Sequence, residues 1–138
     1  MSAIGFDIAP VDSTETVSLE ELCQRSDFIA LACNLTPNNW HMIGREQFDL
    51  MKNGVYIINV ARGHLIDETA LIDNLRSGKI AGAALDVFEV EPLPNESTLQ
   101  EFDNCVFGTH NGSNTKEAVL RVNELYIQNL FKGLGITN

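Results

Sequence analysis

The amino-acid sequence predicts an α/β fold of the doubly wound, Rossmann-like type, built on a parallel sheet. Short apolar runs alternate with segments whose apolar residues recur at helical spacing. The polar side chains best suited to chemistry follow directly after the apolar runs, and the ends of parallel strands are where ligands bind in such sheets. The 138 residues correspond to one domain, and 44% of them are hydrophobic, which is enough for a sizeable core.

The apolar runs predict five strands. Two of the runs, at 28–33 and 55–60, are continuous, which is typical of strands buried on both faces of a parallel sheet. The expected strands lie at 3–6, 28–33, 55–60, 80–85 and 106–107. Loops are expected at 10–16, 36–39 and 89–103.

Four helices are expected between or after these strands. Ser18, with a glutamate three residues later, forms a capping-box pattern that opens the first helix. The second helix is expected at 45–52. Asp67 is the expected cap of the third, and Asn114 is the expected cap of a last helix with apolar residues at helical spacing.

The composition excludes several classes of partner. The formal net charge is −10, from 19 acidic and 9 basic residues, which argues against nucleic acid and against an anionic membrane surface. No apolar run approaches the ~18 residues of a membrane span. The three cysteines show no metal-binding spacing, and we assign no residue to a metal. Their scattered positions, and a start without signal-peptide character, favour reduced thiols in the cytoplasm.

Arg62 is the first candidate for chemistry, because it follows the strand expected at 55–60. A guanidinium at this place could hold a substrate carboxylate through two parallel hydrogen bonds and polarise the neighbouring carbonyl. The alternative is an ordinary surface salt bridge. Gly63 favours the first interpretation, since it lets the backbone turn tightly beside a ligand.

His110 follows the last expected strand and is the natural proton carrier near neutral pH. Glu91 would hold His110 in one tautomer and favour its protonated form through a nearby negative charge, although a lone glutamate in an acidic protein usually faces solvent. The other two histidines are weaker candidates. His41 is expected to serve packing, and His64 stands at a helix start.

Two aspartates also stand at expected strand ends. Asp7 ends the first strand, where an acid in a dinucleotide-binding fold accepts hydrogen bonds from the adenosine ribose and repels the extra phosphate of NADP. The alternative is a solvated turn aspartate. Asp86 ends the strand at 80–85, and its alternative is a cap of a helix or turn.

Three segments, in this order and at these separations, resemble the D-2-hydroxyacid dehydrogenase family, and most closely its phosphoglycerate dehydrogenase branch. The resemblance covers residues 3 to about 134. The most specific pieces are Asn59-Val60-Ala61-Arg62-Gly63, then Gly82-Ala83-Ala84-Leu85-Asp86-Val87-Phe88 through Glu91-Pro92, and then Thr109-His110-Asn111-Gly112-Ser113-Asn114-Thr115.

The resemblance implies an oxidoreductase that moves a hydride between NAD and a small 2-hydroxy acid, as in serine biosynthesis. The catalytic set would be Arg62, Glu91 and His110. The cofactor contacts would be Asp7, Thr36, Ala61, Arg62, Asp86, His110 and Gly112, with Asp86 on the nicotinamide amide. Relatives of this kind are mostly homodimers. A non-catalytic NAD-binding or oligomerisation module is the alternative, and formate dehydrogenase fits poorly because no glutamine stands shortly before His110.

The sequence departs from the family pattern near His110. Thr109 stands where proline is usual, Asn111 replaces an apolar residue, and Ser113 replaces the second glycine of a common pair. These changes touch the wall of the nicotinamide pocket and bear on substrate choice.

A second departure is that no Gly-x-Gly-x-x-Gly run occurs in the sequence. We therefore expect a truncated NAD-binding domain over residues 1–138, without its substrate domain, that begins at the second strand. The central strand of the 3-2-1-4-5-6 order would be missing. Its two neighbours could pair directly, or another chain could fill the gap, and we expect an intermolecular or rearranged sheet.

Overall fold

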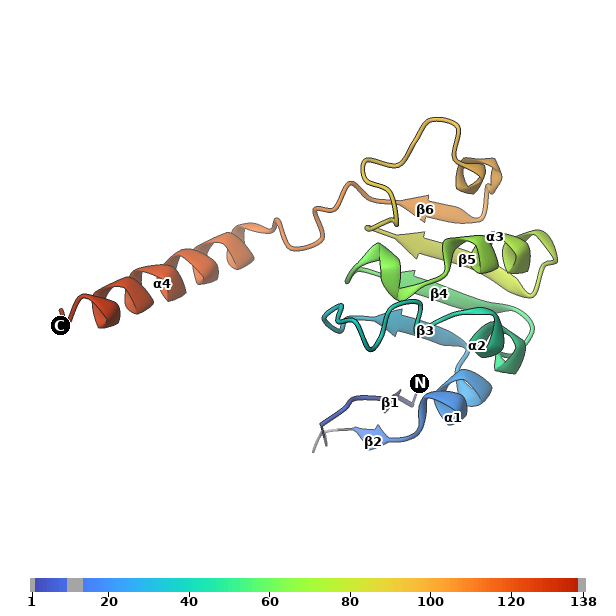
Figure 1. Cartoon of the computed structure of the whole chain (residues 1–138), viewed down its shortest axis with the longest axis horizontal. Coiled ribbons are helices and arrows are strands. Elements are labelled where there is room, and N and C mark those ends of the chain that lie inside the picture. Colours follow the sequence, from blue (N-terminus) through green and yellow to red (C-terminus); the bar gives the residue numbers. More distant parts are fainter. Residues whose placement is uncertain (1, 10–13, 137–138) are drawn as a thin grey trace.

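The computed structural model describes residues 2–9 and 14–136, and its centre is a four-stranded parallel sheet (Figure 1). The strand order is β3-β4-β5-β6, so each new strand is added beside the previous one. The strands are β3 (Phe28–Leu31), β4 (Val55–Asn59), β5 (Ile80–Leu85) and β6 (Cys105–Phe107). The predicted α/β class is confirmed, and the sheet is parallel as expected.

The first predicted strand belongs to a separate two-stranded sheet. β1 (Ile4–Gly5) pairs in parallel with β2 (Glu15–Thr16). The loop predicted at 10–16 is therefore wrong at its end, where β2 lies. A strand of two residues is too short to show an alternating pattern in the sequence. Residues 10–13 of this predicted loop lie outside the described residues. Among the described residues β1 pairs only with β2, so the direct pairing that we considered, between the strand at 3–6 and the other neighbour of the missing central strand, does not form.

The helices begin close to their predicted caps, with one exception. They are α1 (Leu19–Arg25), α2 (Arg45–Leu50), α3 (Glu68–Arg76) and α4 (Lys116–Gly133), with two 3₁₀ turns, η1 (Gly63–Leu65) and η2 (Thr98–Glu101). Ser18 and Asp67 cap α1 and α3 as predicted. Asn114 does not cap α4: Thr115 accepts the hydrogen bond from the Ala118 N–H at 3.1 Å. Both residue types are good caps, and the sequence does not decide between adjacent candidates.

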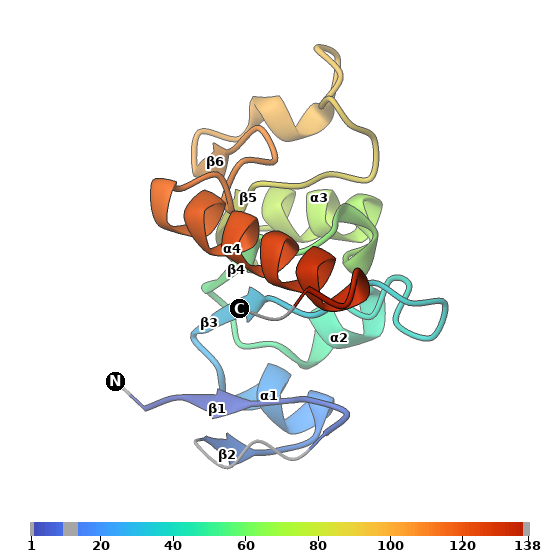
Figure 2. The same cartoon turned by 90° about the vertical axis from the view of Figure 1, so that its left-hand side faces the viewer.

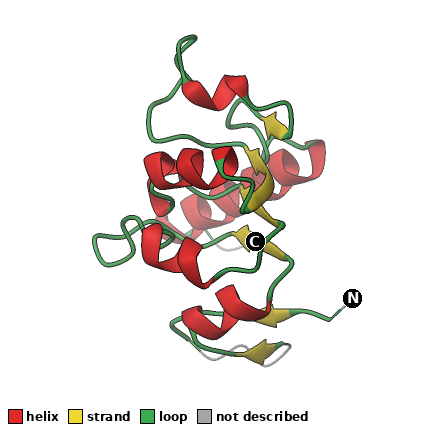
Figure 3. Ribbon diagram, turned by 90° about the vertical axis from the view of Figure 1, so that its right-hand side faces the viewer, coloured by secondary structure: helices red, strands yellow, loops and turns green. Residues whose placement is uncertain are grey.

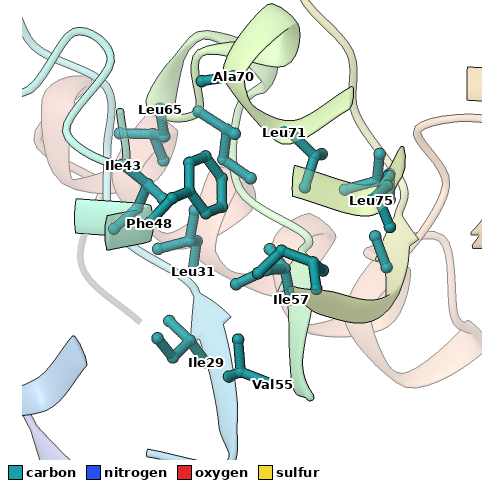
Figure 4. Packing of buried hydrophobic residues seen from close by; sticks show 14 of the residues in the cluster. Ile29, Leu31, Ile43, Phe48, Val55, Ile57, Leu65, Ala70, Leu71 and Leu75 are labelled. Atoms are coloured by element: carbon teal, nitrogen blue, oxygen red, sulfur yellow. The ribbon is translucent and has the colours of Figure 1, made fainter. Parts of the chain in front are cut away.

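The core lies between one face of the large sheet and helices α2 and α3 (Figures 3 and 4). Ile29 and Leu31 of β3 point into this core, whereas Phe28 is 63% exposed and stacks on Tyr56 with ring centroids 5.1 Å apart. The prediction of strands buried on both faces is therefore wrong for β3, and also for β4, where Tyr56 is 44% exposed. The residues of β3 alternate between buried and exposed, because the described helices α2 and α3 cover only one face of the sheet.

Helix α4 extends away from the carboxyl edge of the sheet (Figure 1), and Figure 2 looks onto that edge with α4 in front. The predicted helical spacing is correct, but no residue of α4 is buried. The large apolar side chains along it stay between 38% and 72% exposed. Among the described residues, no helix is long and apolar enough to cross a bilayer.

Candidate active site

Three loops meet at the carboxyl edge of the sheet, one after each of β4, β5 and β6 (Figure 1). Arg62 lies in the first loop, Asp86 and Glu91 lie in the second, and His110 lies in the third. Parallel strands carry their following loops at the same edge, so residues of different loops, here 19 to 48 positions apart in sequence, can meet there.

Glu91 and His110 form the closest pair of candidate residues. The imidazole Nδ1 lies 2.7 Å from a carboxylate oxygen of Glu91, and the other carboxylate oxygen accepts the Phe88 N–H at 3.0 Å. The hydrogen bond with His110 lowers the pKa of Glu91 below its usual value, and the positive charge of Arg62 acts in the same direction. Glu91 is therefore a carboxylate at neutral pH. It orients the ring so that Nε2 is left to exchange a proton.

His110 itself has an unusual backbone. Its φ angle is +56°, in the left-handed region that side chains other than glycine seldom adopt. The conformation is held from both sides, because the His110 N–H donates to the Asp86 carbonyl at 2.9 Å and the ring is bound to Glu91. Such strain is typical of positions where a side chain must point in a fixed direction.

Asn59 builds the turn that presents Arg62. Its buried side chain donates to the Arg62 carbonyl at 2.9 Å and accepts the Ala61 N–H at 3.1 Å. The Arg62 guanidinium donates to the Ala61 carbonyl at 2.6 Å and is in none of the ion pairs found within the described residues. The salt-bridge alternative thus finds no partner there, and the guanidinium remains open to an anion.

Gly63 locks this turn against the neighbouring loop. A Cβ at position 63 would lie 1.9 Å from the Phe88 carbonyl oxygen and 2.5 Å from the Glu89 nitrogen. Only glycine permits this approach of the two backbones. Gly63 was expected to let the backbone turn tightly beside a ligand. The close approach is observed, but the neighbour is the backbone of Phe88 and Glu89.

Asp86 caps the loop that carries His110. Its carboxylate accepts the Asn111 N–H at 3.1 Å and the Gly112 N–H at 2.8 Å. The bond from Gly112 is the main reason why the pKa of Asp86 is lowered. Gly108 is needed here, since a Cβ would meet the Asp86 carboxylate at 2.1 Å. The turn-cap alternative is therefore observed, and the cofactor role of Asp86 remains a prediction.

The remaining predicted cofactor residues are spread along the chain. Ala61 is buried in the turn before Arg62, and Gly112 lies in the loop held by Asp86. Thr36 bonds to the Asn39 side chain, through its N–H at 2.6 Å and its hydroxyl at 3.1 Å. Asp7 belongs to the small sheet and accepts the Ala9 N–H at 2.9 Å. No hydrogen bond within the described part of the chain joins Asp7 or Thr36 to the Arg62–His110 region.

Sequence reasoning missed Asn59 and Gly108 as structural supports of the site, and it misjudged His41. The only signal for Asn59 was a polar residue at the end of an apolar run. His41 was expected to serve packing, yet its Nε2 lies 2.8 Å from a Glu89 carboxylate oxygen. Such pairings need the fold, because 48 positions separate the two residues in the sequence.

The donor set at the sheet edge fits the nicotinamide end of NAD. The ionised Asp86 retains acceptor capacity beyond its two backbone bonds and could accept the carboxamide N–H. Arg62 and His110 stand on the first and third of these loops, at the sheet edge where a substrate carboxylate and its reacting oxygen would need a cation and a proton carrier.

Comparison with known proteins agrees with this chemistry. Residues 1–112 match the family model described as D-isomer specific 2-hydroxyacid dehydrogenase, NAD binding domain. The chain is 48% identical over 125 residues to D-3-phosphoglycerate dehydrogenase of Methanocaldococcus jannaschii, covering 86% of this chain and 24% of that protein. It is 44% identical to hydroxypyruvate reductase of Thermotoga maritima, covering 99% and 46%.

A solved structure is similar along almost the whole chain. D-lactate dehydrogenase from Aquifex aeolicus, complexed with NAD and lactic acid, superposes with a TM-score of 0.85 at 30% identity, covering 99% of this chain and 47% of that one. The chain thus spans between a quarter and a half of the length of the relatives it matches.

Proposed function

Because the chain belongs to the D-isomer specific 2-hydroxyacid dehydrogenase family, through its NAD-binding domain, we propose that the protein carrying it is an NAD-dependent oxidoreductase acting on a small 2-hydroxy acid. The observation that carries the proposal is the His110–Glu91 pair at 2.7 Å, on a loop whose Phe88 and Glu89 backbone lies against the turn of Arg62 and Gly63. A cation, a proton carrier and the acid that orients it are what reduction of a 2-keto acid needs.

In the direction of reduction, the Arg62 guanidinium holds the substrate carboxylate and draws electron density from the adjacent keto group. His110 donates its Nε2 proton to the keto oxygen as hydride reaches the carbonyl carbon, so the C=O bond becomes H–C–O–H. Glu91 is a positioning residue: it holds the Nδ1–H side of the ring and stabilises the imidazolium before the proton leaves. In oxidation the imidazole takes the hydroxyl proton instead.

The cofactor supplies or accepts the hydride when it is bound. The residues that would hold it are Asp86 at the carboxamide and Asp7 at the adenosine ribose. Ala61, Thr36 and Gly112 would contribute backbone contacts along it. A carboxylate at the ribose favours NAD over NADP, since it repels the 2′-phosphate.

We infer a substrate close to 3-phosphoglycerate, and thus a role in serine biosynthesis. The support is the resemblance of the sequence motifs to the phosphoglycerate dehydrogenase branch and the 48% identity to a protein of that name. Another relative is named hydroxypyruvate reductase, so the proposed substrates also include smaller 2-keto acids. We further propose a homo-oligomer in the cytoplasm, the setting that three unpaired cysteines favour.

The test has two stages. Titration with NADH, followed by its fluorescence, asks whether the chain binds cofactor. Oxidation of NADH with hydroxypyruvate, 2-oxoglutarate or phosphohydroxypyruvate then asks which substrate the protein carrying this sequence reduces. Cofactor binding without turnover of any of the three would favour the non-catalytic module.

His110→Ala tests the mechanism directly. We expect turnover to fall by about two to four orders of magnitude, the usual size of a general acid–base contribution. Turnover that stays at the wild-type level would remove His110 from the mechanism.

A further inference from the structure

Behind the candidate active site, three potential metal ligands come together. One imidazole nitrogen of His41, one of His64 and one carboxylate oxygen of Glu89 all lie within 4.8 Å of one another. The three residues stand in the segments that follow β3, β4 and β5. The sequence gives no hint of this grouping, because the ligands are 23 and 25 positions apart and match no local metal-binding motif.

Two nitrogens in this cluster lack a hydrogen-bond partner. His41 Nε2 and His64 Nδ1 are both buried and make no hydrogen bond within the described residues. His41 Nε2 is 2.8 Å from the Glu89 carboxylate, close enough for an ion pair but not aligned as a hydrogen bond. Buried polar atoms are nearly always paired, so these two nitrogens need an explanation.

The surroundings of the cluster favour a cation. Glu68 and Glu89 exchange hydrogen bonds, since each carboxylate accepts the backbone N–H of the other at 3.1 and 3.3 Å. This exchange orients the Glu89 carboxylate and brings a second acidic side chain beside it, the arrangement that supports metal ligands in proteins. The side chains of His41 and Glu89 are 34% and 27% exposed, so the cluster lies close to the surface although the two unbonded nitrogens are buried.

We propose that His41, His64 and Glu89 bind one divalent transition-metal ion of the Zn²⁺ type. Two imidazoles and one carboxylate form a ligand set that zinc uses, with water in the fourth position, whereas Mg²⁺ and Ca²⁺ prefer oxygen ligands throughout. Ligand atoms in a tetrahedral zinc site lie about 3.3 Å apart, because each bond is ~2.0–2.1 Å. The His41–Glu89 distance of 2.8 Å must therefore widen by about 0.5 Å on binding.

The position of the site gives the ion a supporting role. His64 is two residues after Arg62, and Glu89 is two residues before Glu91. An ion bound to His64 and Glu89 would link the two loops that present Arg62 and Glu91. Through His41 the ion would also bind the loop after β3. The inference rests on the cluster alone and does not require the proposed dehydrogenase activity.

Trp40 provides the readout. It is the only tryptophan in the chain, and its ring stacks on His64 with centroids 4.0 Å apart. In tag-free protein stripped with EDTA, Zn²⁺ titrated by calorimetry should bind once with a dissociation constant of about 10 µM or tighter. Zinc in 100-fold excess over that constant should raise Tm by about 9 °C. Co²⁺, which is paramagnetic, should quench the fluorescence of Trp40 with the same one-site stoichiometry.

Variants separate this site from adventitious binding. His64→Gln and Glu89→Gln should each weaken Zn²⁺ binding by more than about 100-fold, beyond the loss caused by an outer-shell change. Glu89→Gln retains an oxygen for the Glu68 N–H, so it serves if His64→Gln fails to fold by circular dichroism. His110→Gln is the matched control, because it removes the third histidine, and it should bind zinc as the wild type does.

Three results would overturn the proposal. The first is no saturable zinc binding by the wild type up to about 1 mM, a range in which any built site would fill. The second is wild-type affinity in the folded ligand variants. The third is a loss of zinc affinity in His110→Gln as large as in the ligand variants, which would show that zinc binds to any accessible imidazole. NADH binding and turnover are measured separately, so failure of the metal site leaves the dehydrogenase proposal to its own test.

Discussion

Adding one methyl group at Gly63 should disturb both the stability and the site. The Cβ of Gly63→Ala would sit 1.9 Å from the Phe88 carbonyl oxygen, and Cβ atoms essentially never approach other atoms within 3.0 Å. The backbone at position 63 and the backbone of Phe88 must therefore move apart by at least 1.1 Å. The neighbouring atoms are main-chain atoms of Phe88 and Glu89, so no side chain can rotate to relieve the overlap.

We expect Gly63→Ala to lower the free energy of unfolding by about 3 kcal/mol, the upper end of the usual cost of overpacking, and Tm by roughly 10 °C. The displacement also reaches the active site, because the Phe88 N–H holds Glu91 and Glu91 holds His110. Turnover of a folded Gly63→Ala protein should fall together with its stability.

Urea unfolding followed by Trp40 fluorescence measures the stability change. Gly133→Ala is the matched control, since a Cβ at this helical position meets nothing within 4 Å, and alanine there should be neutral or slightly stabilising. A loss under about 0.5 kcal/mol for Gly63→Ala, the level expected of an uninvolved surface position, would show that the close approach of the two loops is not a constraint.

Two further substitutions test the supports of the fold. Asn59→Leu replaces the carboxamide by an apolar group of similar branching, which leaves the Ala61 N–H and the Arg62 carbonyl without their partners. Urea unfolding should show a loss of about 2–3 kcal/mol in the free energy of unfolding. Burial raises the pKa of the Cys23 thiol to about 11 from 9.0, so above pH 9 the unfolded chain loses this proton first and stability falls as pH rises. At pH 10 this effect lowers the free energy of unfolding by about 1.4 kcal/mol. The free energy of unfolding of Cys23→Ala should therefore fall less between pH 7 and pH 10 than that of the wild type. Cys33 is exposed, so Cys33→Ala should behave as the wild type does.

The sequence was informative wherever a local pattern determines the structure. Apolar runs located the four strands of the large sheet, and Ser18 and Asp67 located two helix starts, because each depends on residues a few positions apart. Burial on both faces of β3 was predicted wrongly. An apolar run such as 28–31 does not reveal whether a second layer covers the strand, and the exposed Phe28 shows that the described layers cover only one face.

The candidate site was predictable only as a set of separate residues. Position after a strand singled out Arg62 and His110, but no spacing rule brings Glu91 within 2.7 Å of His110 across 19 positions. That contact was implied by resemblance to a family. The pairing of His41 with Glu89 had neither kind of signal, because an imidazole among apolar neighbours in sequence is consistent with simple packing.

The geometry of the site is determined by contacts among the three loops more than by the strands that lead into them. Gly63 holds the first loop against Phe88 of the second, and Asp86 of the second loop binds the backbone of the third through Asn111 and Gly112. The Glu91–His110 bond then joins the second and third loops a further time. The turn of Arg62 and the loop of His110 are thus held largely by main-chain contacts and by glycines, so substitutions of the side chains at Thr109, Asn111 and Ser113 should leave the imidazole in place.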